Sequence, residues 1–269
     1  RVLVTGASSG LGAALAREHA RQGHALLLLA RRAEKLKSLA EDCAGLGSPC
    51  VLVRAGDVGL KANLMAAVRT AQDAWGGLDL AYANAGYSQS GRLEDLSLAQ
   101  WRRQMRVNVE GVLFTAQACG PLLKSARGCF AVVGSVSGYG STSETGAYAA
   151  SKAAVRALTQ ILDLEWAEAG VGVTHIVPGF FASEIRLKDS DGRPSLDKME
   201  YIPDFILGKT EALAKAVRRA VEARRRELIW PKHAKVAVFL MRHLPSLSHA
   251  LNLRISLLRT KQRRKIQGR

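Results

Sequence analysis

The chain has 269 residues, of which 48% are hydrophobic, and a formal net charge of +16. This length suits one large α/β domain with a substantial core. No interior segment approaches the ~20 apolar residues that a membrane-spanning helix needs. The four cysteines, Cys43, Cys50, Cys119 and Cys129, show no paired metal-ligand spacing, and the histidines are scattered. We therefore expect reduced thiols, no bound metal and a cytoplasmic protein.

The positive charge is concentrated at the C-terminal end. Residues 209–269 hold 17 Lys and Arg against three Glu, whereas residues 1–208 hold 22 basic and 20 acidic residues. The N-terminal part is therefore nearly neutral, and a basic extension follows it.

The chain opens with a short apolar run and a glycine-rich turn, residues 5–12, followed by a helical pattern from Ala13. Glycines let the backbone approach a pyrophosphate, and the helix N-terminus supplies free N–H groups. We expect a dinucleotide at this turn, held by Gly6, Ser8, Ser9, Gly10, Leu11 and Gly12. Because Arg1 already lies in the predicted strand, we also expect residues before it in the translated protein.

A second apolar run, Ala25 to Ala30, ends in Arg31 and Arg32. An NAD site usually places an acid at such a strand end to bind the ribose hydroxyls. Ala30 occupies that position here, and two guanidinium groups follow, which match the 2′-phosphate of NADP. The sequence therefore predicts NADP, with a solvated pair of surface arginines as the alternative.

Tyr148 and Lys152 are four residues apart in a helix predicted over 148–168, so their side chains share one helix face. A cation close to the phenol favours the phenolate and should lower the pKa of Tyr148. Ser135 follows a strand-like run that begins at Cys129, so its hydroxyl can project beyond a sheet edge. Together the three groups can hold a carbonyl oxygen and exchange its proton. Ser137 competes with Ser135, and singly each residue also has a purely structural interpretation.

With the glycine turn, this pattern resembles the short-chain dehydrogenase/reductase family over nearly the whole chain. The resemblance implies a single doubly wound parallel sheet of Rossmann type with helices on both faces. It places Asp57 and Val58 at the adenine and identifies residues 83–86 with the family's Asn-Asn-Ala-Gly segment, in which Ala83 replaces an asparagine. It implies a catalytic Asn108 beside Ser135, Tyr148 and Lys152. The further cofactor contacts that it implies are Asn84, Ala85, Gly86, Tyr148, Lys152, Pro178, Gly179, Phe181 and Ser183.

The resulting hypothesis is an NADP(H)-dependent oxidoreductase acting on a carbonyl/alcohol pair. Tyr148 would give its proton to the alkoxide and Ser135 would orient the carbonyl. By resemblance, Lys152 would hold the nicotinamide ribose and Asn108 a relay water, and the protein would form a homodimer or homotetramer. Two alternatives stay open: a non-enzymatic NADPH-binding protein that its basic tail recruits to a membrane or partner, and hydride chemistry within an epimerase or a multi-step pathway.

Strand–helix alternation lapses after Pro178, and residues 180–207 are rich in apolar side chains. Because ligands bind beyond the carboxyl ends of the strands, we expect a substrate lid here and a hydrophobic or extended small-molecule substrate, such as a lipid-like, steroid-like or aryl ketone. Residues 1–208 would then form the catalytic domain. Residues 209–269 would form a basic helical extension that belongs to the same domain or makes a peripheral contact.

For residues 236–269, contact with an anionic membrane surface and a solvated or subunit-packed segment are equal alternatives. Nucleic acid ranks lower because no recognition motif accompanies the charge. Pro245 should break or kink the segment.

Overall fold

The computed structural model describes residues 1–179 and 208–266. Its sheet is formed by β1 (Val2–Thr5), β2 (Leu26–Ala30), β3 (Val51–Ala55), β4 (Leu80–Ala83), β5 (Cys129–Val133), β6 (Gly172–Pro178) and β7 (Glu227–Trp230). The α-helices are α1 (Gly10–Ala20), α2 (Ala33–Gly45), α3 (Lys61–Trp75), α4 (Leu98–Met105), α5 (Gly111–Ala126), α6 (Gly146–Glu165), α7 (Thr210–Glu222), α8 (Lys232–His243) and α9 (Pro245–Ile266). Short helical turns add η1 (Leu93–Asp95), the π-helical η2 (Arg106–Glu110) and η3 (Val136–Gly138).

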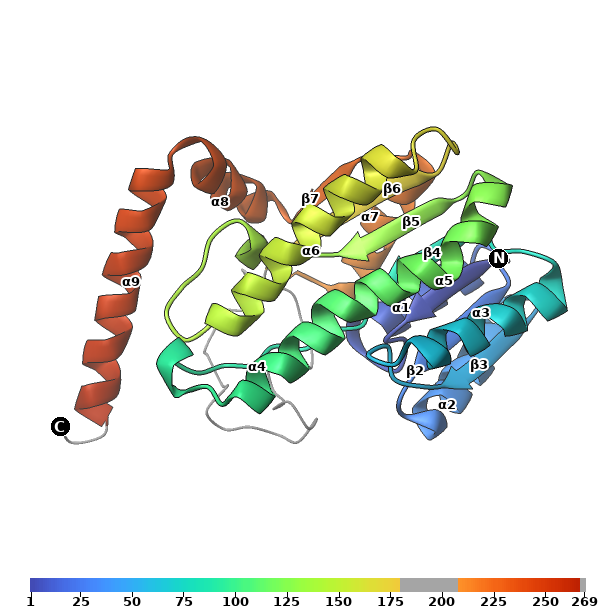
Figure 1. Cartoon of the computed structure of the whole chain (residues 1–269), viewed down its shortest axis with the longest axis horizontal. Coiled ribbons are helices and arrows are strands. Elements are labelled where there is room, and N and C mark those ends of the chain that lie inside the picture. The colour runs from blue at the N-terminus through green and yellow to red at the C-terminus, as the bar shows by residue number, and fades with distance from the viewer. Residues whose placement is uncertain (180–207, 267–269) are drawn as a thin grey trace.

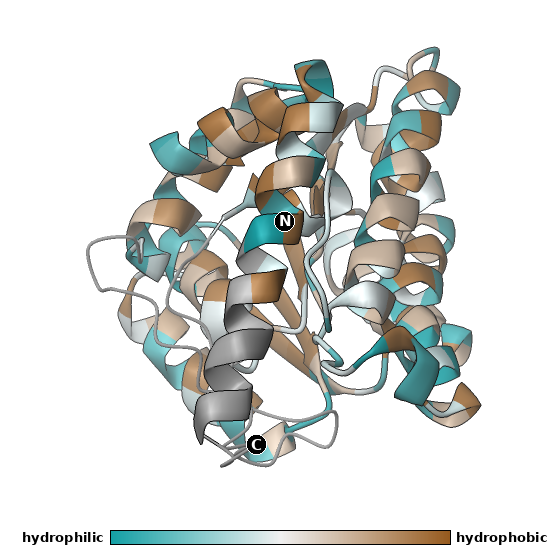
Figure 2. Ribbon diagram, turned by 90° about the vertical axis from the view of Figure 1, so that its left-hand side faces the viewer, coloured by the Kyte–Doolittle hydropathy of each residue, from teal (hydrophilic) through white to brown (hydrophobic). Residues whose placement is uncertain are grey.

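All seven strands are parallel, in the order β3-β2-β1-β4-β5-β6-β7. Helices cover both faces of the sheet (Figure 1). In β2, every residue is buried because Leu26 and Leu28 face α1, α2 and α7, whereas Leu27 and Leu29 face α3 and α5. Such continuous apolar strands are typical of parallel sheets that have helices on both faces. Figure 2 shows this as brown strands between helices. The predicted Rossmann-type fold is confirmed.

The sheet domain extends past the predicted boundary at residue 208. Helix α7 packs against α1, and β7 pairs in parallel with β6, from His175 opposite Glu227 to Pro178 opposite Trp230. Residues 210–230 thus belong to the sheet layers, and the part that lies outside them is α8 and α9. β7 was missed because it is only four residues long and directly follows three arginines.

Pro245 separates α8 from α9, as its sequence position predicts. It is the first residue of α9, where a missing N–H costs no helical hydrogen bond. In Figure 1, α9 packs against α8 and stands away from the sheet at the edge of the molecule. Within the described parts of the chain, no helix is both long enough and apolar enough to cross a bilayer.

The strand order changes direction between β1 and β4, since β2 lies on one side of β1 and β4 on the other. In doubly wound sheets, ligands bind at this switch point, outside the carboxyl ends of the strands. A ligand site is therefore expected at the turn after β1 and at the residues after β4, β5 and β6.

Candidate active site

The glycine turn after β1 is fixed against the end of β4. Nδ2 of Asn84 donates to the carbonyl of Thr5 (2.8 Å), and the backbone N–H groups of Asn84 and Ala85 donate to Thr5 Oγ1 (3.0 and 3.1 Å). Gly6 has a φ of +66°, and a methyl group there would lie 2.8 Å from Cα of Ala85. A methyl group at Gly12 would overlap the carbonyl of Gly6 and lie 2.6 Å from Nδ2 of Asn84. This turn therefore leaves no room for side chains at Gly6 and Gly12.

Of the two arginines after β2, Arg32 is the one that reaches this turn. Its guanidinium donates to Ser8 Oγ (2.9 Å) and Ser9 Oγ (2.7 Å). Arg31 is exposed at the end of β2, and Ala30 is buried. The turn thus combines hydroxyls, a helix N-terminus and a guanidinium group, all suited to bind a phosphate.

The remaining predicted cofactor contacts lie at the same edge of the sheet or outside the described residues. Asp57 follows β3 and accepts a hydrogen bond from the N–H of Gly59 (2.8 Å), and Val58 is buried beside Gly111. Gly179 follows β6, and its N–H donates to the carbonyl of Trp230 (2.7 Å). Phe181, Ser183 and the predicted lid at 180–207 lie outside the described residues.

Ser135, Tyr148 and Lys152 meet at the carboxyl end of β5. Ser135 is buried, and its hydroxyl acts on the phenol of the half-buried Tyr148, whose pKa it lowers. Tyr148 and Lys152 lie one turn apart on α6, and Nζ of Lys152 lies 5.8 Å from the centre of the Tyr148 ring. Nζ is anchored by a 2.7 Å hydrogen bond to the carbonyl of Val133. The structure therefore brings the three predicted groups together and favours Ser135 over Ser137, whose backbone N–H donates to Ser135 Oγ.

The pKa of Tyr148 departs from the prediction. Burial raises it, and the hydrogen bond from Ser135 lowers it only in part, so the net shift is upward. The prediction of a lowered value is therefore wrong for this structure. Burial also disfavours the charge of Lys152 and lowers its pKa to about 8, which weakens the cation that was expected to act on the phenol. The phenol of Tyr148 is thus protonated at neutral pH rather than a preformed phenolate.

Asn108 lies in the π-helical turn η2 and joins the end of β4 to α6. Its Nδ2 donates to the carbonyl of Tyr87 and to Ser151 Oγ (both 3.0 Å), and its Oδ1 accepts from the N–H of Tyr87 (3.1 Å). Ser151 in turn donates to the carbonyl of Tyr148 (2.7 Å). Both hydrogens of this amide are therefore used within the protein, so its side chain supports α6. The predicted water-holding role stays a prediction.

Two residues of this site were not singled out from the sequence. Thr5 links β1 to β4 through its hydroxyl, and Ser151 links Asn108 to α6. The sequence places Thr5 in the glycine-rich segment, which could have predicted its role. For Ser151, the only indication in the sequence is its position between Tyr148 and Lys152. Gly86 lies close to Asn108 and Lys152, because a methyl group there would be 3.2 Å from Asn108 Oδ1 and 3.7 Å from Lys152 Nζ. No three His, Cys, Asp or Glu side chains gather into a metal-binding group within residues 1–179 and 208–266.

The fold and this site define a Rossmann-type α/β protein with a serine, a tyrosine and a lysine at the sheet's carboxyl edge. A family model for short chain dehydrogenases matches residues 1–193. An uncharacterized oxidoreductase from Staphylococcus epidermidis is 38% identical over 178 residues, which cover 66% of this chain and 76% of that protein. One from Staphylococcus aureus is 36% identical over 211 residues, which cover 78% and 90%. The chain belongs to the short-chain dehydrogenase/reductase family and is an oxidoreductase of that family.

Solved structures show the same fold. A short-chain dehydrogenase/reductase from Burkholderia phymatum in complex with NAD superposes with a TM-score of 0.81 at 25% identity, covering 91% of this chain and 94% of that one. An alcohol dehydrogenase from Thermococcus sibiricus, complexed with 5-hydroxy-NADP, gives a TM-score of 0.74 at 28% identity, covering 84% and 94%.

Proposed function

We propose that this protein is an NADP(H)-dependent oxidoreductase that interconverts a ketone or aldehyde and an alcohol. The observation that carries the proposal is the convergence of Ser135 and Tyr148 beside the anchored amine of Lys152 at the carboxyl end of β5. These groups follow β5 at the sheet edge where the glycine turn follows β1.

The proposed reaction divides the work between the bound cofactor and the chain. NADPH, when bound, supplies the hydride for the carbonyl carbon. Ser135 orients the carbonyl oxygen, and Tyr148 gives its proton to the oxygen as negative charge develops there. Lys152 holds the nicotinamide ribose and offsets negative charge near the phenol, and Asn108 holds α6 in register through Ser151. The raised pKa of Tyr148 fits this direction, because a proton donor must be protonated before transfer.

The proposed substrate is a small-molecule carbonyl or alcohol compound of apolar character. The apolar sequence of residues 180–207 supports it, since this segment follows β6 on the side where ligands of such sheets bind. We also propose a homodimer or homotetramer, which light scattering of the purified protein would test.

Arg32 is expected to determine the preference for NADPH. Its guanidinium already lies on Ser8 and Ser9, and hydrogen bonds to charged groups contribute about 1.5–3 kcal/mol. Arg32→Ala should therefore raise the KM for NADPH about 10- to 100-fold and change that for NADH little. Arg31→Ala, which changes the exposed neighbour, should have a smaller effect. The assay follows NADPH or NADH oxidation with a panel of apolar ketones and aldehydes.

Arg21→Ala is the matched control, because Arg21 is also exposed but follows the far end of α1. If the wild-type protein prefers NADH and both Arg32→Ala and Arg31→Ala keep that preference, the assignment of NADPH as the cofactor is contradicted. Absence of oxidation across the whole panel would favour the non-enzymatic alternative.

The proposal places the protein in the cytoplasm, with α8 and α9 in contact with an anionic membrane surface. Residues 228–269 contain ten Lys and Arg and no Asp or Glu. Several apolar side chains on this segment are exposed, and two of them, Leu247 and Leu251, are four residues apart on α9 and so share one helix face. A second copy would bring like charges together, whereas an anionic bilayer compensates them at about 1 kcal/mol for each basic residue.

Flotation with liposomes tests this contact. The protein should bind vesicles of phosphatidylglycerol and phosphatidylcholine, bind phosphatidylcholine alone at least tenfold less, and dissociate as salt rises. The double substitution Leu247→Asp and Leu251→Asp should abolish binding, whereas Leu164→Asp, at a 72% exposed leucine on α6, should not. Equal binding to neutral vesicles, or salt-resistant self-association that the double substitution abolishes, would contradict the membrane assignment.

A further inference from the structure

The turn that carries Ser135 ends at Tyr139, a residue to which the proposed reaction gives no role. The carbonyl of Ser135 accepts from the N–H of Gly138, and the N–H of Tyr139 donates to the carbonyl of Val136 (both 3.0 Å). With the bond from Ser137 N to Ser135 Oγ, residues 135–139 form one continuous hydrogen-bonded turn. A displacement of Tyr139 would therefore be transmitted to the hydroxyl of Ser135.

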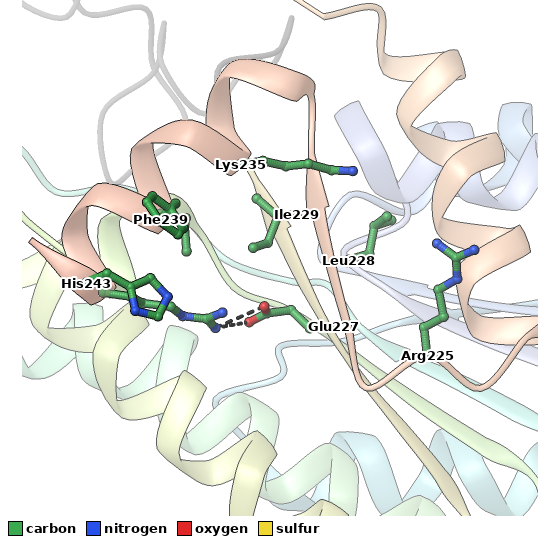
Figure 3. A pocket seen from close by; sticks show the side chains of 9 residues that line it. Arg225, Glu227, Leu228, Ile229, Lys235, Phe239 and His243 are labelled. Carbon is green, nitrogen blue, oxygen red and sulfur yellow. Dashed lines mark hydrogen bonds and ion pairs between the residues drawn. The ribbon is translucent and has the colours of Figure 1, made fainter.

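The side chain of Tyr139 is held from several sides. Two guanidinium groups lie against its ring. The guanidinium carbon of Arg156 (α6) is 4.6 Å from the ring centre, and that of Arg242 (α8) is 4.7 Å from it. Its hydroxyl donates to Glu227 at the start of β7 and accepts from Arg242 Nη2 (2.9 Å). Arg242 Nη2 also donates to both carboxylate oxygens of Glu227 (2.7 and 2.9 Å), and Figure 3 shows these contacts as dashed lines at Glu227. We call Tyr139, Glu227 and Arg242 the Tyr139 cluster.

The same turn is also packed tightly between α6 and α8. A methyl group at Gly138 would lie 2.7 Å from the carbonyl oxygen of Lys152, and one at Gly140 would lie 3.0 Å from Sδ of Met241. Arg156 lies one helical turn beyond Lys152 on α6. The Tyr139 cluster therefore joins α8 to the helix and the turn that carry the proposed catalytic groups.

The ionisation states of the residues in the cluster do not change over the pH range of ordinary enzyme assays. Burial raises the pKa of Glu227, but hydrogen bonds from His175, Tyr139 and Arg242 outweigh it and lower the pKa to about 2. Burial and the bond to Glu227 raise the pKa of Tyr139 to about 12. The buried His175, with Nδ1 3.6 Å from Glu227, has a pKa lowered by burial. Glu227 thus stays ionised and Tyr139 protonated, so their contacts with Arg242 persist.

We propose that Arg242 is a positioning residue, which acts through Tyr139 to hold the Ser135 turn in its reactive geometry. Helix α8, although outside the sheet, is then part of the active-site scaffold. The inference rests on the proposed function in one respect, the role of Ser135 in orienting the carbonyl.

A double-mutant cycle tests this inference. Arg242→Met should lower kcat about tenfold. This is less than the ~100-fold loss that a 1 Å misplacement of a catalytic group can cause. The Kd for NADPH should stay within about twofold of the wild-type value. In a Ser135→Ala background the same substitution should cost nothing further, because the group that it positions is absent. A role in overall stability alone would lower kcat by the same factor in both backgrounds. Arg225→Met, at an exposed arginine just before β7, should leave kcat unchanged.

Tyr139→Phe is a second variant, which keeps the ring between the two arginines and removes only its hydroxyl; it should show the same non-additivity even if Arg242→Met fails to fold. Unchanged kcat in Arg242→Met and Tyr139→Phe, or additive losses with Ser135→Ala, would overturn the inference and leave the proposed function standing. Unchanged turnover in Ser135→Ala alone would overturn both.

Discussion

Tyr148→Phe should lower turnover about 10²–10⁴-fold, the range that a positioned acid–base group contributes. The phenol is the proposed proton donor, and it lies beside Lys152 in the group that includes Ser135. Phenylalanine keeps the ring and its packing on α6, so the Kd for NADPH should change little. Steady-state turnover and a fluorescence titration with NADPH separate the two effects.

Tyr82→Phe is the control for this substitution. It removes a buried phenol that is hydrogen-bonded to Nε2 of His19 (2.8 Å), outside the proposed site. Its turnover should stay within about twofold of the wild type, whatever its effect on stability. Turnover of Tyr148→Phe at the wild-type level would exclude Tyr148 as the proton donor.

Gly12→Ala should be the most damaging substitution in the cofactor turn. The added methyl group would overlap the carbonyl of Gly6 and approach Nδ2 of Asn84 to 2.6 Å, so the start of α1 must move away from the end of β4. Because a shift of about 1 Å can cost ~100-fold, we expect kcat/KM for NADPH to fall by that order. Initial rates at varied NADPH and a fixed carbonyl concentration measure it.

Gly45→Ala provides the matched glycine substitution. Gly45 ends α2, and a methyl group there would meet no atom within 4 Å. Its kcat/KM for NADPH should equal that of the wild type. If Gly12→Ala behaves like Gly45→Ala, the glycine turn does not hold the cofactor.

The sheet was predictable because its central strands are short, continuous apolar runs followed by distinctive turns. β2, with four leucines in a row, is buried on both faces as such a run implies. β7 was not predictable in the same way, since its residues are only partly buried and the residues of β6 that pair with it lie 52 positions earlier in the chain. The break at Pro245 was predictable because proline lacks the N–H that a helix interior requires.

Much of the candidate site followed from spacing, but its electrostatics did not. The four-residue spacing of Tyr148 and Lys152 places them on one face of a helix, whereas the pKa of Tyr148 depends on how deeply that face is buried. Whether Arg31 or Arg32 meets the glycine turn depends on the path of the chain after β2. The Tyr139 cluster combines the residue after η3 with residues of β7 and α8, and no local pattern in the sequence joins them.

The central claim is hydride transfer between a nicotinamide and a carbonyl carbon at the Ser135–Tyr148–Lys152 site. It is tested most directly with NADPH deuterated at C4, prepared as each of its two diastereomers, and an apolar ketone or aldehyde that the panel shows to be turned over. Mass spectrometry of the product should find one deuterium on the carbinol carbon from one diastereomer and none from the other, with both reactions slowed in Tyr148→Phe. Product alcohol without deuterium from either diastereomer, or equal labelling by Tyr148→Phe at the wild-type rate, would contradict it.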